Sequence, residues 1–156
     1  MTNISEHITF REAVHSDIAI KFGIENIPTC EQMTNIELTS ERIFEPLRKG
    51  LGGHAIHISS FFRNLEVNTE AKGSKTSRHM TGQAMDLDAD YYKVVTNEEI
   101  FNFIRDNLEF DKLIWEYEGA GGPAWVHVSY VPGKNRKLVY KASVASNGKT
   151  KYTLIR

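Results

Sequence analysis

The chain has 156 residues, of which 40% are hydrophobic and 25% are charged, and this composition fits one compact domain better than two. Nineteen Lys and Arg residues against twenty Asp and Glu residues leave a net charge of −1, so we expect no nucleic-acid partner. Because the longest apolar runs are only a few residues, far short of the ~20 that a membrane helix needs, we expect no membrane span.

Helical signals dominate the first third of the chain. A short helix capped by Ser16 is expected to end near Gly23. Thr29 and Gln32 have the spacing of a capping box, which predicts a second helix with a long apolar stripe. Pro46 lies inside that stripe, so the second helix should kink or restart there.

Strand signals begin in the middle of the chain. Apolar and polar residues alternate over 54–60, which predicts a half-buried strand, and a second strand is predicted over 85–88. Between the second strand and the next strand signal, Thr96 and Glu99 form a capping box for a helix through about Leu108.

The last third of the chain is rich in strand-forming residues. Residues 112–117 and 124–130 predict two strands of a hairpin, joined by the Gly-rich segment 118–123. Two further short strands are expected on either side of 146–148. Because helices come first and strands later, we expect the α+β class, with N-terminal helices packed on a mainly antiparallel sheet.

Cysteine usage narrows the kinds of metal site that the chain can form. Cys30 is the only cysteine, which excludes both a disulfide within the chain and a Cys-rich zinc site. Any metal must therefore be held by histidine and carboxylate side chains. The first seven residues have neither a basic start nor a continuous apolar stretch, so we expect that a signal peptide is either absent or already removed.

The stretch from Ser77 to Asp88 contains two residues of metal-ligand type, His79 and Asp86, seven positions apart. On a helix, seven residues rise about 10 Å, whereas two ligand atoms of one tetrahedral zinc lie roughly 3 Å apart. A turn must therefore bring the two side chains together, and Gly82 permits one. If Asp86 begins a strand, Asp88 shares its face and is a candidate partner of the ligands.

A third candidate ligand, His127, lies in the strand predicted over 124–130. The odd-numbered residues of this strand face one way and its valines face the core, so His127 can reach a cleft. Taken alone, His127 and Asp86 each fit an ordinary solvated or hydrogen-bonded residue more often than a ligand. The residues by themselves therefore leave both interpretations open.

Two motifs carry a resemblance to a known family. They are Ser77-x-His79-x-x-Gly82-x-Ala84-x-Asp86 and Trp125-x-His127. This pattern resembles that of the zinc D-alanyl-D-alanine carboxypeptidases and related phage endolysin peptidases, which have the hedgehog-like peptidase fold. Residues 44–48 and 56–64 look like the Pro-Leu-Arg and Ser-Gly-Tyr-Arg-Ser segments of that family, and the resemblance covers about residues 8–131.

The resemblance implies a catalytic zinc site. It assigns His79, Asp86 and His127 as zinc ligands and Arg63 and Ser77 as residues that bind the substrate. Three protein ligands leave a fourth position for water, as a catalytic zinc requires. Zn²⁺ is therefore the expected cofactor.

The catalytic base is the point at which the chain departs from the family pattern. Many relatives have an acidic base three residues before the last histidine, but Ala124 stands there and can move no proton. Glu116 lies on the preceding strand and would approach His127 if the hairpin closes near residues 120–122. We therefore predict Glu116 as the base, with Glu118 as the second choice.

The predicted function is zinc-dependent hydrolysis of peptide bonds in peptidoglycan stem peptides, by a D-Ala-D-Ala carboxypeptidase or a related endopeptidase. Residues 1–156 are expected to form a single zinc peptidase domain that acts as a monomer on a peptidoglycan peptide. The sequence leaves the location open: without a signal peptide in the chain, we expect either the cytoplasm or release in the manner of a phage or prophage lysin.

Two alternatives to an active enzyme remain open. The first is a zinc-bound but catalytically inactive hedgehog-like binding domain, and the missing acid at Ala124 supports it. The second is a metal-free structural domain.

Overall fold

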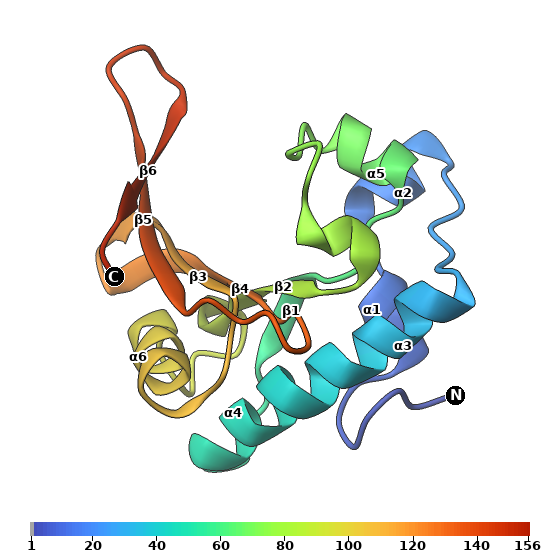
Figure 1. The fold of residues 1–156 in the computed structure, drawn as a ribbon, viewed down its shortest axis with the longest axis horizontal. Coiled ribbons are helices and arrows are strands. Elements are labelled where there is room, and N and C mark those ends of the chain that lie inside the picture. Colours follow the sequence, from blue (N-terminus) through green and yellow to red (C-terminus); the bar gives the residue numbers. More distant parts are fainter. Residues whose placement is uncertain (1) are drawn as a thin grey trace.

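The computed structural model describes residues 2–156, which fold into helices packed beside one mixed sheet (Figure 1). The sheet has six strands in the order β1-β2-β4-β3-β5-β6. The α-helices are α1 (Phe10–Val14), α2 (Asp17–Phe22), α3 (Cys30–Thr39), α4 (Glu45–Gly50), α5 (Leu65–Glu70) and α6 (Asn97–Asn107). The strands are β1 (His57–Ser60), β2 (Ala84–Asp88), β3 (Lys112–Gly119), β4 (Gly122–Ser129), β5 (Leu138–Val144) and β6 (Thr150–Leu154).

The helix ends follow the capping signals of the sequence. The Ser16 side chain caps α2, which ends at Gly23 in a left-handed conformation. Thr29 begins α3 and Thr96 begins α6, each within a complete capping box. The structure confirms these three predicted caps. They could be predicted from the sequence because the hydrogen bonds of a cap join residues only two or three positions apart.

The long second helix changes its geometry before Pro46. A π-helical segment, Ser40–Phe44, joins α3 to α4, so the three pieces run as one rod (Figure 1). Pro46 then lies at the start of α4, directly after the π-helical segment. The restart expected at this proline is confirmed, and the π-helical segment accommodates it.

The sheet is antiparallel at every pairing of neighbouring strands except that of β3 with β5, which is parallel. Successive side chains along a strand point to opposite faces of the sheet, so that one face packs on the helices and the other carries polar side chains. The predicted α+β class with a mainly antiparallel sheet is confirmed.

The apolar core lies between one face of the sheet and the helices that pack on it, α6 and the rod formed by α3 and α4. The helix α6 packs against β3 and β4, and it also contacts α4. The fully buried side chains of this core include Ile43, Leu47, Met85, Leu87, Ile100, Ile104, Leu113, Val126 and Val128. Since this core uses only one face of β2, β3 and β4, the other face of these strands is free for chemistry.

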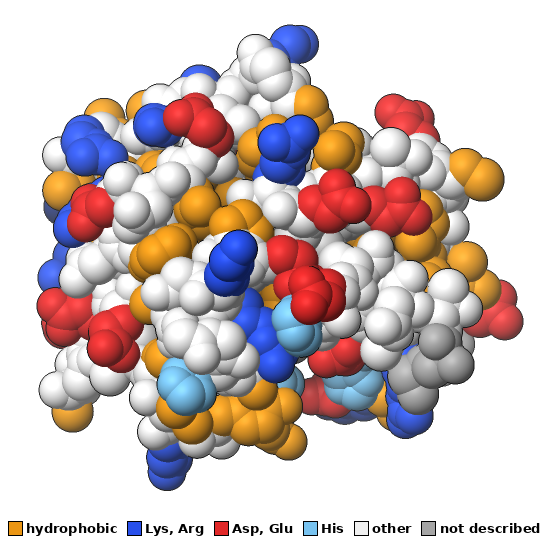
Figure 2. Space-filling view, turned by 90° about the horizontal axis from the view of Figure 1, so that it is seen from below, with side chains coloured by type: hydrophobic (Ala, Val, Ile, Leu, Met, Phe, Trp, Pro, Cys, Tyr) orange, Lys and Arg blue, Asp and Glu red, His pale blue; other side chains and the backbone are white. Residues whose placement is uncertain are grey.

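The face shown in Figure 2 carries basic, acidic and hydrophobic side chains, in keeping with a net charge of −1. Across residues 2–156, no helix has the length and hydropathy needed to cross a membrane.

Gly82 combines a left-handed backbone conformation with close packing against α3. Its φ is +74°, and an added Cβ would lie 2.7 Å from both the Gln32 carbonyl oxygen and Ile36 Cγ1. We expect Gly82→Ala to lower the free energy of unfolding by roughly 2–4 kcal/mol, from left-handed strain and steric overlap together, as measured by urea denaturation.

Gly133→Ala is the matched control for this prediction. Gly133 also has a positive φ, +71°, but within the described residues an added Cβ would meet no atom within 4 Å. Only the backbone strain of about 1 kcal/mol should remain. Equal losses in the two variants would contradict the argument from close packing.

Candidate metal centre

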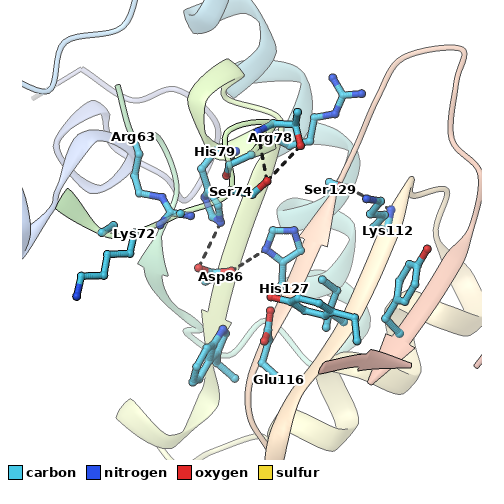
Figure 3. Close-up of a pocket in the computed structure, with 18 of the residues that line it drawn as sticks. Arg63, Lys72, Ser74, Arg78, His79, Asp86, Lys112, Glu116, His127 and Ser129 are labelled. Carbon is cyan, nitrogen blue, oxygen red and sulfur yellow. Dashed lines mark hydrogen bonds and ion pairs between the residues drawn. The ribbon is translucent and has the colours of Figure 1, made fainter. Parts of the chain in front are cut away.

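Three side chains from three different elements converge on the polar face of the sheet. His79 comes from the 3₁₀ turn Arg78–Thr81, Asp86 from β2 and His127 from β4 (Figure 3). Asp86 and His127 pair directly across the two strands, so their side chains share one face. One ligand atom from each of the three residues lies within 4.8 Å of the other two.

The His79 ring is held in a single tautomer. It is only 1% exposed, and its Nδ1 lies 2.7 Å from the Phe61 carbonyl oxygen. Because a carbonyl oxygen can only accept, Nδ1 carries the proton and Nε2 presents a lone pair. Nε2 has no hydrogen-bond partner within residues 2–156, and it faces Asp86 Oδ2 at 3.3 Å.

The Asp86 carboxylate lies between the two imidazoles. Its Oδ1 accepts a hydrogen bond from Nδ1 of His127 at 2.9 Å, while Oδ2 faces His79. Burial alone would raise the pKa of Asp86, but the two histidines outweigh burial and hold that pKa well below its usual range. Burial lowers the pKa of His79, and this effect outweighs the opposing effect of the carboxylate. An ionised carboxylate and a neutral His79 are therefore the forms favoured near neutral pH.

The helix α3 positions the turn that carries His79. Its side chains donate hydrogen bonds to three successive carbonyl groups, those of residues 80, 81 and 82. The donors are Gln32 Nε2 at 3.0 Å, Asn35 Nδ2 at 2.9 Å and Thr39 Oγ1 at 3.1 Å. These bonds join segments more than 40 positions apart, and the sequence motifs did not indicate them.

The buried side chain of Asn26 positions the segment that follows β1. Its amide nitrogen donates to the Phe62 carbonyl at 2.9 Å, and its amide oxygen accepts from the Asn64 N–H at 2.8 Å. This segment supplies the Phe61 carbonyl that binds His79, and the Arg63 N–H donates to the His79 carbonyl at 3.1 Å. His79 is thus fixed both by its ring and by its backbone.

Glu116 lies on the same face of the sheet as the three candidate ligands. It pairs with Trp125 across the β3–β4 hairpin, so the predicted register is confirmed. Figure 3 shows its carboxylate directed toward His127. The side chain is buried, at 7% exposure, and burial together with the charge of Asp86 raises the pKa of Glu116 to about 7.

Glu118, the second candidate for the base, lies elsewhere. Tyr117 between the two glutamates has a φ of +60°, which breaks the regular alternation of β3. Glu118 is exposed and forms an ion pair with Lys141 at 2.6 Å, beside a groove that also contains Trp115. The side chain of Glu118 is therefore not among those that line the cleft of the candidate ligands.

Arg63 and Ser77 both line the cleft around the candidate ligands. Arg63 is half-buried, and Figure 3 shows its side chain extending toward the His79 and Asp86 pair. Burial lowers the pKa of Arg63, against the opposing effect of Asp86, and its buried Nε has no hydrogen-bond partner in the described part of the chain. The Ser77 hydroxyl oxygen accepts from the His79 N–H at 3.3 Å, which leaves the hydroxyl proton available to another acceptor.

The cleft itself has a volume of about 540 Å³. Polar and basic residues of the segment 71–79 line one part of it, and the open face of the sheet lines another. Tyr140 and Tyr152 also line the cleft, although both come from the C-terminal strands, which neither motif includes. No signal in the sequence pointed to these two tyrosines.

Asp88 does not support the candidate ligands as the strand pattern suggested. Its carboxylate accepts hydrogen bonds from the Asp90 N–H at 3.0 Å and from Asn97 Nδ2 at 3.3 Å, so it caps the turn that follows β2. The Phe61 carbonyl takes the supporting role at His79 instead. The physical reason is that the chain bends into the 3₁₀ turn Ala89–Tyr91 directly after Asp88.

A protein-family match covers the part of the chain that carries these side chains. A family model described as Peptidase M15 matches residues 6–129, which include every candidate site residue of the sequence motifs. The chain belongs to the Peptidase M15 family, a family of metallopeptidases, and its α+β fold is compatible with the hedgehog-like peptidase fold. No curated protein matched the chain.

The donor set fits the zinc on which M15 peptidases generally depend. A neutral imidazole nitrogen that faces a carboxylate oxygen at 3.3 Å places two electron pairs against each other, and a bound cation would relieve this repulsion. Nitrogen and oxygen donors from two histidines and one aspartate are typical of a catalytic zinc site. The hydrogen bond from His79 Nδ1–H to a backbone carbonyl is the usual support for such a ligand.

Removing one candidate ligand should separate metal binding from folding. The unchanged chain should contain about one zinc per molecule after purification without chelator, and His127→Ala should lose that zinc. The fold should persist, since His127 lies on the face of β4 opposite the core. Metal analysis together with circular dichroism measures both results.

His57→Ala is the matched control for the loss of zinc. His57 also lies on a strand, but its ring stacks on Tyr91 with ring centroids 4.2 Å apart, outside the cleft. This variant should retain its zinc. An unfolded His127→Ala protein would contradict the separation of core and site.

Zinc content should fall with decreasing pH. Protons compete with a metal for histidine ligands, because the ordinary pKa of imidazole is about 6.5. Because burial lowers the pKa of His79, proton competition at this ligand begins below the pH at which a free imidazole is protonated. Asp86 stays ionised throughout, as its pKa lies below its usual range. Dialysis at pH 7.5 should preserve the zinc and dialysis at about pH 4 should remove it, whereas constant content would argue against histidine ligation.

Proposed function

We propose that this chain is a zinc-dependent peptidase that hydrolyses peptide bonds next to D-amino acids in peptidoglycan stem peptides. His79, Asp86 and His127 would hold the zinc. The observation that carries the proposal is the convergence of these three donors, within 4.8 Å of one another, in a cleft that also contains a buried carboxylate. Membership of the M15 family supports the peptidase part of the proposal.

Glu116 is proposed as the general base. When bound, zinc would supply a Lewis acid that polarises the scissile carbonyl and makes water more acidic. Glu116 would accept a proton from the attacking water and donate it to the nitrogen of the leaving amine. A pKa raised toward 7 suits both steps, because a carboxyl group with that pKa can accept a proton and return it at neutral pH.

Arg63 and Ser77 are proposed to bind a carboxylate of the substrate. The half-buried guanidinium that lines the cleft supports this role for Arg63, since it can donate charge-assisted hydrogen bonds to a carboxylate bound there. The Ser77 hydroxyl could donate a further bond. A carboxylate site this close to the candidate metal favours a substrate with a free C-terminus, as in carboxypeptidase action at a terminal D-Ala.

The alternative is a zinc-bound binding domain that does not turn over substrate. Ala124 favours that alternative, because it leaves no acid at the position that many relatives use. Glu116 favours an enzyme, because it provides a buried carboxylate in the same cleft. Variants of Glu116 therefore distinguish the two functions.

Glu116→Gln should retain zinc and lose turnover. The amide preserves size and polarity but cannot accept a proton, so kcat should fall about 10²- to 10⁴-fold. The substrate is diacetyl-L-lysyl-D-alanyl-D-alanine, with release of D-Ala measured by mass spectrometry. The same peptide with an amidated C-terminus tests the carboxylate site and should be cleaved more slowly.

Glu118→Gln is the matched control, because Glu118 pairs with Lys141 outside the cleft. It should retain nearly full activity. Full activity of both variants would remove Glu116 from the mechanism, and zinc-loaded wild-type protein that hydrolyses no stem peptide would favour the binding domain.

A further inference from the structure

The C-terminal strands lie outside the part of the chain that matches the family. The family match ends at Ser129, whereas β5 and β6 span residues 138–154. β5 adds to the sheet in parallel with β3, and β6 follows it as the edge strand, so the two form a hairpin that extends from the rest of the molecule (Figure 1). Any role of this hairpin is therefore a property of this chain and not of the matched region.

The strand register places one side chain of the hairpin in line with Glu116. Trp125 of β4 pairs with Glu116 of β3, which pairs with Ala142 of β5, which in turn pairs with Tyr152 of β6. Directly paired residues point to the same face, so all four side chains share the face of the cleft. Because Ala142 between them is small and fully buried, the Tyr152 ring can lean across it toward Glu116.

A hydrogen bond holds the hairpin against the body of the sheet. The hydroxyl groups of Tyr117 and Thr150 lie 2.6 Å apart, which joins the end of β3 to the start of β6. The Tyr117 ring also packs against Trp125, with ring centroids 5.3 Å apart. These contacts fix the position of β6 relative to the cleft.

Tyr152 is available to a ligand and suited to bind one. It lines the cleft, yet it is 54% exposed. Burial of its hydroxyl, together with the charges of Glu116, Tyr117 and Asp86, raises the pKa of Tyr152, so the phenol remains a neutral hydrogen-bond donor at physiological pH. The opposite part of the cleft contains basic side chains, those of Arg63, Lys72 and Arg78.

We propose that Tyr152 is a substrate-binding residue, and that the hairpin β5–β6 forms the wall of the cleft that selects the peptide. Its ring would pack on the peptide beside Glu116, and its hydroxyl would donate a hydrogen bond to a backbone carbonyl of that peptide. The carboxylate end of the peptide would lie toward Arg63. This inference rests on the proposed function, because it names a residue that binds the same substrate.

The test measures binding separately from turnover. Zinc-loaded Glu116→Gln protein serves as the background, and the probe is diacetyl-L-lysyl-D-alanyl-D-alanine titrated by calorimetry. Adding Tyr152→Phe should raise Kd about 3-fold through loss of one hydrogen bond. Adding Tyr152→Ala should raise Kd by roughly 10-fold or more, because the ring contact is lost as well. On the active background, KM should rise for both substitutions and zinc content should stay the same.

Thr153→Ala is the matched control. Thr153 is the next residue along the same exposed strand and pairs with Lys141, so it faces away from the cleft, and its Kd and KM should not change. Thermal unfolding shows whether each variant folds. If Tyr152→Ala fails to fold, the change in Kd of Tyr152→Phe, which preserves the ring, tests the proposal.

Two failures can be told apart. If the unchanged chain hydrolyses the peptide and the Tyr152 variants bind it as tightly as their background, the inference about Tyr152 is wrong and the proposed function stands. If zinc-loaded wild-type protein neither binds nor hydrolyses the peptide, the proposed function is wrong and the inference about Tyr152 is overturned with it.

Discussion

The His79 ring is the constraint on which the candidate site depends. Its Nδ1–H donates to the Phe61 carbonyl, and this bond leaves Nε2 as an acceptor that faces the Asp86 carboxylate. A buried imidazole without a partner at one nitrogen is unfavourable unless a cation binds there. The hydrogen bonds from α3 and Asn26 therefore preserve an arrangement that the side chains would not adopt by themselves.

The sheet separates stability from chemistry. Along β2 and β4, residues that point one way are fully buried against α6 and the long helix, while Asp86 and His127 point the other way. A strand alternates with a period of two, so a single strand can supply both the core and the cleft. Substitutions in the cleft therefore need not weaken the core, and the cleft can keep a cluster of buried polar groups.

Much of the fold follows from local patterns in the sequence. Ser16, Thr29 and Thr96 cap helices with side chains two or three positions from the bonds they make, and such bonds are encoded in short motifs. The register of the β3–β4 hairpin is likewise local, since a short turn determines which residues pair, and it brings Glu116 opposite Trp125. No sequence motif marks the backbone break at Tyr117, where the side chains of β3 stop alternating between the two faces. The sequence therefore left Glu118 as a second candidate for the base.

The sequence by itself predicted the fold class and the helix caps from local patterns, and its resemblance to a known family indicated His79, Asp86 and His127 as candidate ligands. Only the tertiary structure decided what holds those residues in place and what else lines the cleft. At least 18 positions separate the Phe61 carbonyl from His79, the α3 side chains from the turn that they bind, and Tyr152 from Glu116 in the same cleft. Contacts at such separation depend on how the elements pack together, and no local pattern records that packing.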